Sequence, residues 1–534
     1  MPFNQPWDPP KSSFTTLHCE VSLKLNTHTH VVAAATTTGL SIHSFTIVMC
    51  ALLLLLLDGT QGESVSASCD DKIKIAKRLA SFGVDYIEAG WPGSNPKDQE
   101  FFQRAKTELT ESERAKLVAF GSTRRKHVSV QEDAQIAALV ESQAPTVCLV
   151  AKGHGWQVTE ILRATLDENL SMIYDSVQYL TQHGRQVMVD LEHFFDGYRS
   201  DPAYALRCCE TAAKAGATCL VLCDTNGGTM PWKVAEYTQT VLQHMMTFAN
   251  NNNDKSSGVT IGIHAHNDCG MAVANSIMAA QAGAGLVQGT MNGIGERTGN
   301  ADLCAIVPSL ALHVESELRC KVEHTTSVSR FVDEILNRTP DTSAPFVGAS
   351  AFAHKGGLHV AAMERSPLSY QHIDPSLVGN EKRVLISELS GRQNIMGKIQ
   401  QVNGMVDDAS ERAVAILNRV KRLENRGYTF EGAEASVHLM ILHATKGYCP
   451  PFRVLDYSVH VYENNMDSAS RVLDLEMRHN QDSRLVGPTA RATVKVRTVN
   501  PDDQVRKPKM YFLLLLACLW LTHTHLFLAG IPRL

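Results

Sequence analysis

The stretch TIGIHAHNDCGMAVANS, which spans Thr260–Ser276, places two histidines at the end of a short apolar run. His264 and His266 are one residue apart, so in a β-strand both side chains point to the same face. The residues that follow carry apolar side chains at helical spacing. The stretch therefore predicts a buried strand, a histidine pair at its end and then a helix. The pair indicates a metal site, although two polar residues that cap a strand give the same pattern.

The same order of strand and helix recurs along the chain. Eight short apolar runs end in polar residues, and helical patterns separate them at intervals of about 30 residues, the length of a βαβ unit. Eight such units predict an α/β fold, a (β/α)8 TIM barrel, with an open doubly wound sheet as the alternative. In a barrel the carboxyl ends of the strands meet at one rim. The residues at these predicted ends are Asp58, Glu88, Glu192, Asp224, Thr225, His264, His266 and Asn292.

The composition is that of an ordinary globular protein. The chain has 534 residues, is 44% hydrophobic and 20% charged, and has a formal net charge of −5. It contains no basic stripe, so we expect no nucleic-acid partner. The 13 cysteines form no CxxC pair, which favours reduced thiols over a disulfide framework. We therefore expect the cytoplasm or an organelle such as a plastid or mitochondrion.

Composition and periodicity change along the chain and predict five segments. After the barrel, short helical patterns are broken by Pro and Gly, and two later runs, FRVLDYSVHVYE and ARATVKVRTV, alternate apolar and polar residues as antiparallel strands do. We predict an atypical N-terminal segment (1–51), the barrel (52–320), helical linker and lid subdomains (321–445), a small truncated α+β C-terminal domain (446–508) and an atypical apolar tail (509–534).

The two ends of the chain differ from the middle. The run TIVMCALLLLLL, Thr46–Leu57, is shorter than the roughly 20 residues of a membrane span, so we expect no membrane partner for the core domains. THTH occurs at Thr27–His30 and again at Thr522–His525, and translation of a CA dinucleotide repeat would produce it. We interpret both ends as translated non-coding sequence from a faulty gene model. Genuine targeting or anchoring segments are the alternative.

The histidine pair lies near two oxygen donors in the predicted barrel. Asp58 ends the first strand, which is adjacent to the eighth in a closed barrel, and Asn300 follows the eighth. Two imidazoles with carboxylate and amide oxygens suit Mg²⁺, Mn²⁺ or Zn²⁺. A 2-oxo acid could chelate the open positions of such an ion, which would draw electrons from the ketone carbon.

Seven motifs resemble, in order, those of one known family, the 2-isopropylmalate and homocitrate synthases. They are LDGTQGESVS, DYIEAGWPGSNPKD, DLEHFFDGY, CDTNGG, IHAHNDCGMAVANS, GTMNGIGERTGN and RVLISELSGRQNI. The resemblance covers roughly residues 58–499 and implies a metal-dependent acyltransferase that condenses acetyl-CoA with a 2-oxo acid, as a homodimer. It also implies a C-terminal domain that senses the end-product amino acid.

Within this family, the resemblance of GWPGSNPKD and EHFFDGY favours the branch that takes pyruvate as the 2-oxo acid, with citramalate as product on the way to isoleucine. The alternative within the family is 2-isopropylmalate synthase, which serves leucine biosynthesis and takes a larger branched 2-oxo acid. A lyase of the hydroxymethylglutaryl-CoA type is disfavoured, because such enzymes lack the long region after residue 330. A non-catalytic relative is the third alternative.

The resemblance also implies residue roles. Glu192 matches a carboxylate that helps to deprotonate the acetyl methyl group, although it could be an ordinary strand-end carboxylate. Thr225 matches a threonine that contacts the 2-oxo acid carboxylate, with a helix N-cap as the alternative. His359 matches a lid residue that takes part in proton transfer. Tyr370 is a weaker candidate for the same lid, with ordinary packing as the alternative. The implied metal ligands are Asp58, His264, His266 and Asn300.

One position departs from the family pattern. The family places an arginine directly before the metal-binding aspartate, where it stabilises the oxyanion, and this chain has Leu57. An aliphatic side chain donates no hydrogen bond, and loss of one such donor typically costs about 10²–10³ in rate. Either the upstream sequence is wrong, which we favour because the resemblance stops at this residue, or the enzyme as written is impaired.

Overall fold

The computed structural model describes residues 48–53, 58–251, 259–403, 409–445, 448–450, 452–462 and 489–498. Both predicted atypical ends lie largely outside the described residues, and so does Leu57. The origin of these ends as translated non-coding sequence therefore stays a prediction.

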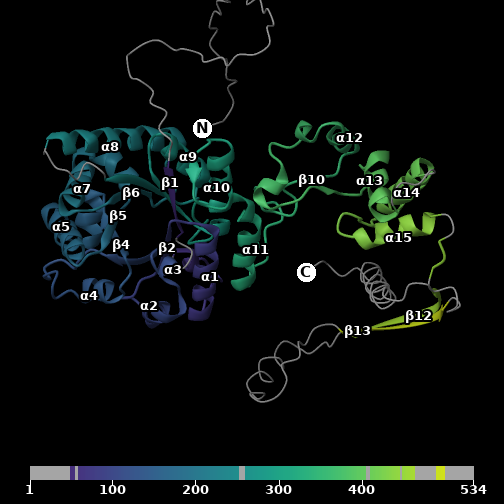
Figure 1. Cartoon of the computed structure of the whole chain (residues 1–534), viewed down its shortest axis with the longest axis horizontal. Helices are drawn as coiled ribbons and strands as arrows, with labels where there is room; N and C mark the ends of the chain where they lie inside the picture. Colours follow the sequence, from purple (N-terminus) through teal and green to yellow (C-terminus); the bar gives the residue numbers. More distant parts are fainter. Residues whose placement is uncertain are drawn as a thin grey trace, which may run out of the picture. The chain divides into compact units, whose positions relative to one another are not determined.

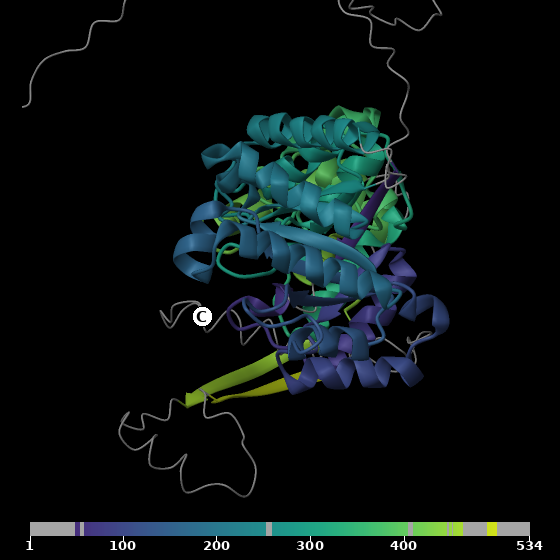
Figure 2. The ribbon, with the colours of Figure 1, turned by 90° about the vertical axis from the view of Figure 1, so that its left-hand side faces the viewer.

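Eight parallel strands form a barrel, and a ninth short strand, β9 (Glu317–Leu318), extends the sheet by pairing in parallel with the start of β1. In the sheet the eight barrel strands follow the order β2 to β8 and then β1, and β1 also pairs with β2, which closes the barrel. The structure confirms the predicted (β/α)8 barrel, and Figures 1 and 2 show its strands enclosed by helices. The strands are β1 (Val48–Leu53), β2 (Tyr86–Gly90), β3 (Leu117–Ser122), β4 (Thr146–Lys152), β5 (Gln186–Glu192), β6 (Cys219–Asp224), β7 (Thr260–Ala265) and β8 (Leu286–Gly289).

Local signals in the sequence set the helices that cover the barrel. For example, Ser68 and Asp71 form a capping box at the start of α1, and Gly83 ends that helix in the left-handed conformation. The covering helices are α1 (Cys69–Phe82), α2 (Pro96–Glu108), α3 (Glu111–Arg114), α4 (Ala134–Glu141), α5 (Leu166–Gln182), α6 (Phe194–Ser200), α7 (Pro202–Ala215), α8 (Pro231–Asn251), α9 (Ala272–Gln281) and α10 (Leu303–Leu312).

The first strand differs from its prediction. We expected the leucine run that ends at Asp58, but β1 spans Val48–Leu53 and Asp58 begins a 3₁₀ turn, η1 (Asp58–Gln61). The barrel therefore begins before the predicted boundary at residue 52. A continuous apolar run carries no turn residue and no periodicity, so the sequence alone cannot place the strand within it. Its neighbours set the register, with Cys50 opposite Leu286 and Leu53 opposite Gly289.

A helical extension follows the barrel, as predicted. α11 (Thr325–Ile335) adds Val328 and Val332 to the barrel core. The next stretch contains β10 (Ala353–His354), α12 (Gly357–Arg365) and β11 (Arg383–Val384), and β10 pairs with β11 in parallel. Three further helices share a separate apolar core, and we call them the helical module. They are α13 (Arg392–Asn403), α14 (Ala409–Glu424) and α15 (Glu434–Ala444).

The two alternating runs of the C-terminal region form an antiparallel hairpin. β12 (Phe452–Tyr462) pairs with β13 (Thr489–Thr498) along its whole length, which agrees with the predicted strands. The other residues of the predicted α+β domain lie outside the description. Among the helices that the structure describes, none has both the length and the apolar character needed to cross a bilayer.

A buried ion pair joins α1 to α2 at the side of the barrel. The ammonium group of Lys72 contacts the carboxylate of Asp98 and lies 3.4 Å from the carbonyl of Ala89. Asp98 also accepts hydrogen bonds from the backbone N–H of Trp91 and from the amide of Asn95. Burial lowers the pKa of Lys72, and the charge of Asp98 partly offsets that effect.

We expect Lys72→Ala to lower the free energy of unfolding by about 3–5 kcal/mol, because it leaves the Asp98 charge buried and unpaired. The matched control is Lys74→Ala on the same helix, where Lys74 is exposed and lies 3.8 Å from Asp71. That change is expected to cost at most about 1 kcal/mol. Urea unfolding followed by tryptophan fluorescence measures both, and equal midpoints for the two variants would contradict the prediction.

Candidate active site

Three of the predicted metal ligands lie together at the end of β7. The Nε2 atom of His264 is 3.3 Å from Nε2 of His266 and 3.2 Å from Oδ1 of Asn300. The two imidazole rings are stacked with centroids 5.0 Å apart. All three side chains are buried. Two ring nitrogens and one amide oxygen thus point into the same small space.

The loop after β8 returns to β7 and delivers Asn300. His266 and Asn300 form an antiparallel bridge, and the side-chain amide of Asn300 donates to the carbonyl of Ile294. That hydrogen bond turns Oδ1 toward His264. Gly295 has a φ of +156°, and a Cβ there would lie 2.2 Å from Nδ2 of Asn300. A glycine is needed at this position so that the asparagine can occupy its place.

His266 is held neutral. Burial is the main cause that lowers the pKa of His266 to about 3, and the neighbouring His264 is the second. A neutral imidazole keeps one lone pair, and a metal ion needs that lone pair. The donor set of two imidazole nitrogens and an amide oxygen therefore fits a divalent cation that accepts mixed nitrogen and oxygen ligands.

The fourth predicted ligand is not tested. Asp58 begins η1, but its side chain lies outside the described residues. Its role as a ligand stays a prediction.

Glu192 ends β5 and pairs with Lys152, which ends the neighbouring strand β4. Both side chains are about one quarter exposed, at 27% and 25%, so the carboxylate is open to a substrate. The next residue, His193, adopts the left-handed conformation and donates its backbone N–H to the hydroxyl oxygen of Thr225 at 2.8 Å. This contact joins Glu192 and Thr225 at the carboxyl ends of β5 and β6.

Thr225 is not the N-cap of the helix that follows it. The alternative of a capping role fails because α8 begins only at Pro231. The backbone carbonyl of Thr225 instead accepts a hydrogen bond from Arg297, which also forms a two-point ion pair with Asp268. Arg297 therefore links the loops that follow β6, β7 and β8, and the sequence analysis did not identify it.

Two residues of the extension that were predicted to act as lid residues lie against each other. The rings of His359 and Tyr370 stack with centroids 4.3 Å apart. His359 belongs to α12, and Tyr370 follows η5 (Pro367–Ser369). The structure thus pairs these two residues, and their action at the barrel rim stays a prediction.

Other predicted strand-end residues have structural contacts. Asn292 accepts from the hydroxyl of Ser329 at 2.6 Å and donates to its carbonyl, so it fastens α11 to the barrel. Asp224 accepts from the hydroxyl and the backbone N–H of Thr229, and burial raises its pKa. Glu88 is buried on β2.

A second group of potential ligands lies deeper in the barrel. Asp190 on β5, Cys223 on β6 and His264 each offer one ligand atom, and these atoms lie within 4.8 Å of one another. The side-chain oxygen of Gln288 on β8 lies 2.8 Å from Nδ1 of His264, where it can accept a hydrogen bond. The sequence analysis missed Asp190 and Gln288, although each is a polar residue inside an otherwise apolar strand.

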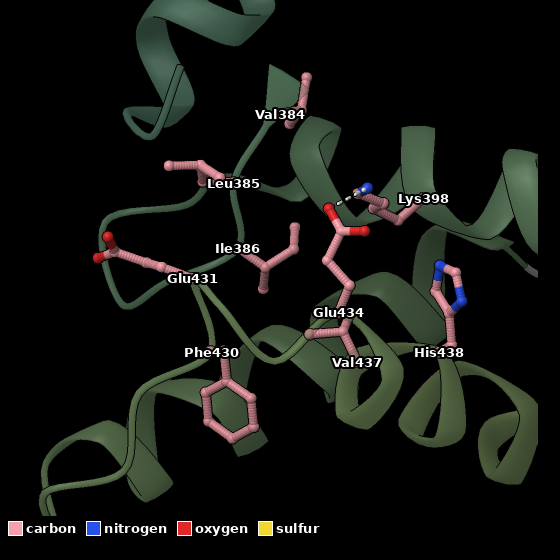
Figure 3. A pocket seen from close by; sticks show the side chains of 9 residues that line it. All are labelled: Val384, Leu385, Ile386, Lys398, Phe430, Glu431, Glu434, Val437 and His438. Atoms are coloured by element: carbon pink, nitrogen blue, oxygen red, sulfur yellow. Dashed lines mark hydrogen bonds and ion pairs between the residues drawn. The ribbon is translucent and has the colours of Figure 1, made fainter. Parts of the chain in front are cut away.

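A recess in the helical module is lined by residues of α13 and α15 and by the chain around β11 (Figure 3). Within it the ammonium group of Lys398 lies 3.4 Å from the carboxylate of Glu434. The space open to water amounts to about 10 Å³, room for roughly one molecule. This recess is too small for an acyl-CoA or a 2-oxo acid.

Comparison with known proteins supports the same assignment as the fold and the donor set. The HMGL-like family model matches residues 54–332, and the model described as "Homocitrate synthase post-HMGL domain-like" matches residues 346–428. An (R)-citramalate synthase from Synechocystis is 46% identical over 76% of this chain and 73% of its own length. One from Aquifex aeolicus is 46% identical over 72% of this chain and 71% of its own. The chain belongs to the citramalate synthase family.

The sequence identity of this chain is higher to the citramalate synthases than to the 2-isopropylmalate synthases. A 2-isopropylmalate synthase from Sulfolobus acidocaldarius is only 32% identical, over 71% of this chain and 92% of its own length. Membership of the citramalate synthase family makes the chain a condensing enzyme of the acyltransferase class. The HMGL-like match also supports dependence on a divalent metal, whose identity stays open.

Proposed function

We propose that the enzyme condenses acetyl-CoA with pyruvate and water to give citramalate and CoA, on the way to isoleucine. The observation that carries this proposal is the convergence of His264, His266 and Asn300 on one small space at the carboxyl end of the barrel. The identity of 43–46% to five (R)-citramalate synthases supports the choice of pyruvate.

We assign Asp58, His264, His266 and Asn300 as the residues that hold a divalent Mg, Mn or Zn ion. When bound, such an ion acts as a Lewis acid toward the ketone of the 2-oxo acid. His266 fits this role because burial keeps it neutral, and His264 fits because its Nε2 faces the same space. Asn300 fits because its amide nitrogen already donates to the carbonyl of Ile294, which leaves its oxygen for the ion.

Glu192 is the proposed base. Its carboxylate lies at the rim, partly exposed, and its contact with Lys152 holds it in place. It takes a proton from the methyl group of acetyl-CoA, and the resulting carbanion attacks the ketone carbon. Thr225 orients the 2-oxo acid, because its hydroxyl oxygen already accepts the N–H of His193 and its own proton is left to donate to the substrate carboxylate.

His359 and Tyr370 are proposed to close over the substrate from the extension and to take part in proton transfer to the new alkoxide. Their stacked rings support a shared role, because the contact fixes the imidazole against the phenol.

A panel of 2-oxo acids tests the proposed reaction. Purified protein is mixed with acetyl-CoA, Mg²⁺ or Mn²⁺ and one acid at a time, and thiol release is followed. We expect release with pyruvate. Release only with 2-oxoisovalerate would favour a 2-isopropylmalate synthase. If none of the acids gave thiol release, an impaired relative would be favoured, the alternative that Leu57 suggests.

We further propose a homodimer in a reducing compartment, the cytoplasm or an organelle. The extension exposes Leu358, Leu368 and Leu389 by 78%, 73% and 61%, which supports a contact with a second copy. The compartment is supported by the free thiols, which include the adjacent pair Cys208 and Cys209.

A further inference from the structure

A chain of hydrogen bonds crosses the interior of the barrel and ends on a histidine of the donor set. Asp190 on β5 accepts from the side-chain amide of Gln288 on β8 at 2.9 Å, and Oε1 of Gln288 lies 2.8 Å from Nδ1 of His264 on β7. The sulfur of Cys148 on β4 also lies 3.0 Å from the same oxygen of Asp190. Every member of this chain is buried.

The contacts fix which atom donates and which accepts in each hydrogen bond of this series. The amide nitrogen of Gln288 and the thiol of Cys148 both donate to the same oxygen of Asp190, so this oxygen acts as an acceptor. The amide nitrogen of Gln288 must therefore face Asp190, which leaves its carbonyl oxygen toward His264. A carbonyl oxygen also only accepts, so Nδ1 of His264 must carry the proton.

That proton leaves the other ring nitrogen free. In a neutral imidazole with a proton on Nδ1, Nε2 carries the lone pair, and Nε2 is the atom that faces His266 and Asn300. The second histidine has no such support, since Nδ1 of His266 is buried without a hydrogen-bond partner in the described part of the chain. The surrounding hydrogen bonds therefore fix the tautomer of His264, whereas Nδ1 of His266 has no such contact among the described residues.

We propose that Asp190 and Gln288 are positioning residues, which fix His264 as the Nδ1–H tautomer so that Nε2 binds the catalytic cation. This inference rests on the proposed metal site. On this inference, Asp190, Cys223 and His264 do not form a second metal site. Nδ1 of His264 is hydrogen-bonded to Gln288 and is not available as a ligand between Asp190 and Cys223.

Four variants test the direction of the chain. Gln288→Met removes the acceptor at similar volume, and Asp190→Asn removes the charge that orients the glutamine. The double variant Asp190→Asn with Gln288→Glu exchanges carboxylate and amide, so an acceptor for the Nδ1 proton is restored. Met188→Leu is the matched control, because Met188 is buried on the same strand and on the same face as Asp190.

The readout is the dissociation constant of Co²⁺, titrated by its visible absorption. We expect Gln288→Met and Asp190→Asn to bind about 10–100-fold more weakly, as loss of such supporting partners typically does. The double variant is expected to recover most of the affinity, and Met188→Leu to leave it unchanged. Unchanged affinity in both single variants, or no recovery in the double variant, would overturn the proposal. So would a strong thiolate-to-cobalt band, which would place the ion beside Cys223.

The tautomer is read independently of metal binding. Nitrogen NMR of the metal-free protein, labelled at histidine and held in mildly alkaline buffer, should show a protonated Nδ1 for His264 in the wild type and a tautomer mixture in Gln288→Met. A wild type with the proton on Nε2 would refute the inference. If the wild type binds no Co²⁺ but shows the expected tautomer, the proposed metal site fails and the inferred orientation stands. Thermal unfolding of the metal-free variants separates both results from loss of fold.

Discussion

Replacing His266 by alanine is expected to lower kcat/KM for pyruvate by about 10²–10⁴. The reason is that the change removes one of three converging donors, and polarisation of the ketone by a bound ion contributes several kcal/mol to the barrier. Steady-state thiol release at saturating Mn²⁺ measures the loss.

The matched control is His244→Ala. His244 lies on the outside of the barrel on α8, where its Nε2 is 2.9 Å from the carboxylate of Glu210. It should leave kcat/KM unchanged. If His266→Ala retained wild-type activity while both proteins had the same melting temperature, His266 would not belong to the catalytic site.

Replacing Leu57 by arginine is expected to raise kcat by about 10²–10³. The resemblance to the family implies an arginine at this position that stabilises the oxyanion formed as the ketone is attacked, and one preorganised donor contributes about that factor. The gain should appear in kcat more than in KM, because the charge develops only in the transition state. Thiol release at saturating pyruvate measures it.

Leu56→Arg is the control for this change, since it places the same charge one residue earlier. It should give no gain. Equal activities for Leu57→Arg and the wild type would mean that this position does not lie against the oxyanion, whereas a full gain would show that the rest of the site is intact. The second outcome would also favour an error in the sequence upstream of Asp58.

The barrel could be predicted because its strands end in recognisable places. β4, β5, β6 and β7 each begin and end within the apolar runs that the sequence marked, since polar or turn residues bound those runs. β1 could not be placed, because the leucine run has no such boundary. Pairing with β8 and β2 decides its register, and pairing is a property of the closed sheet.

The convergence of three proposed ligands could be predicted from their positions in the barrel, and the contacts that support them could not. His264, His266 and Asn300 lie at strand ends or in the loop after β8, and the geometry of a barrel brings such residues to one rim. Gln288 is 24 residues from His264, and Asp190 is 98 residues from Gln288. Their contact depends on which interior positions face each other across the barrel. A polar residue within GLVQGT or VMVDLE is the signal that would have identified them.

Anomalous diffraction from crystals grown with Mn²⁺ and pyruvate tests the central claim most directly. The account predicts one manganese peak about 2.0–2.3 Å from Nε2 of His264, Nε2 of His266 and Oδ1 of Asn300, with the carboxylate of Asp58 as a further ligand. A peak on the Nδ1 side of His264, between Asp190 and Cys223, or a crystal with bound pyruvate and no manganese, would contradict it.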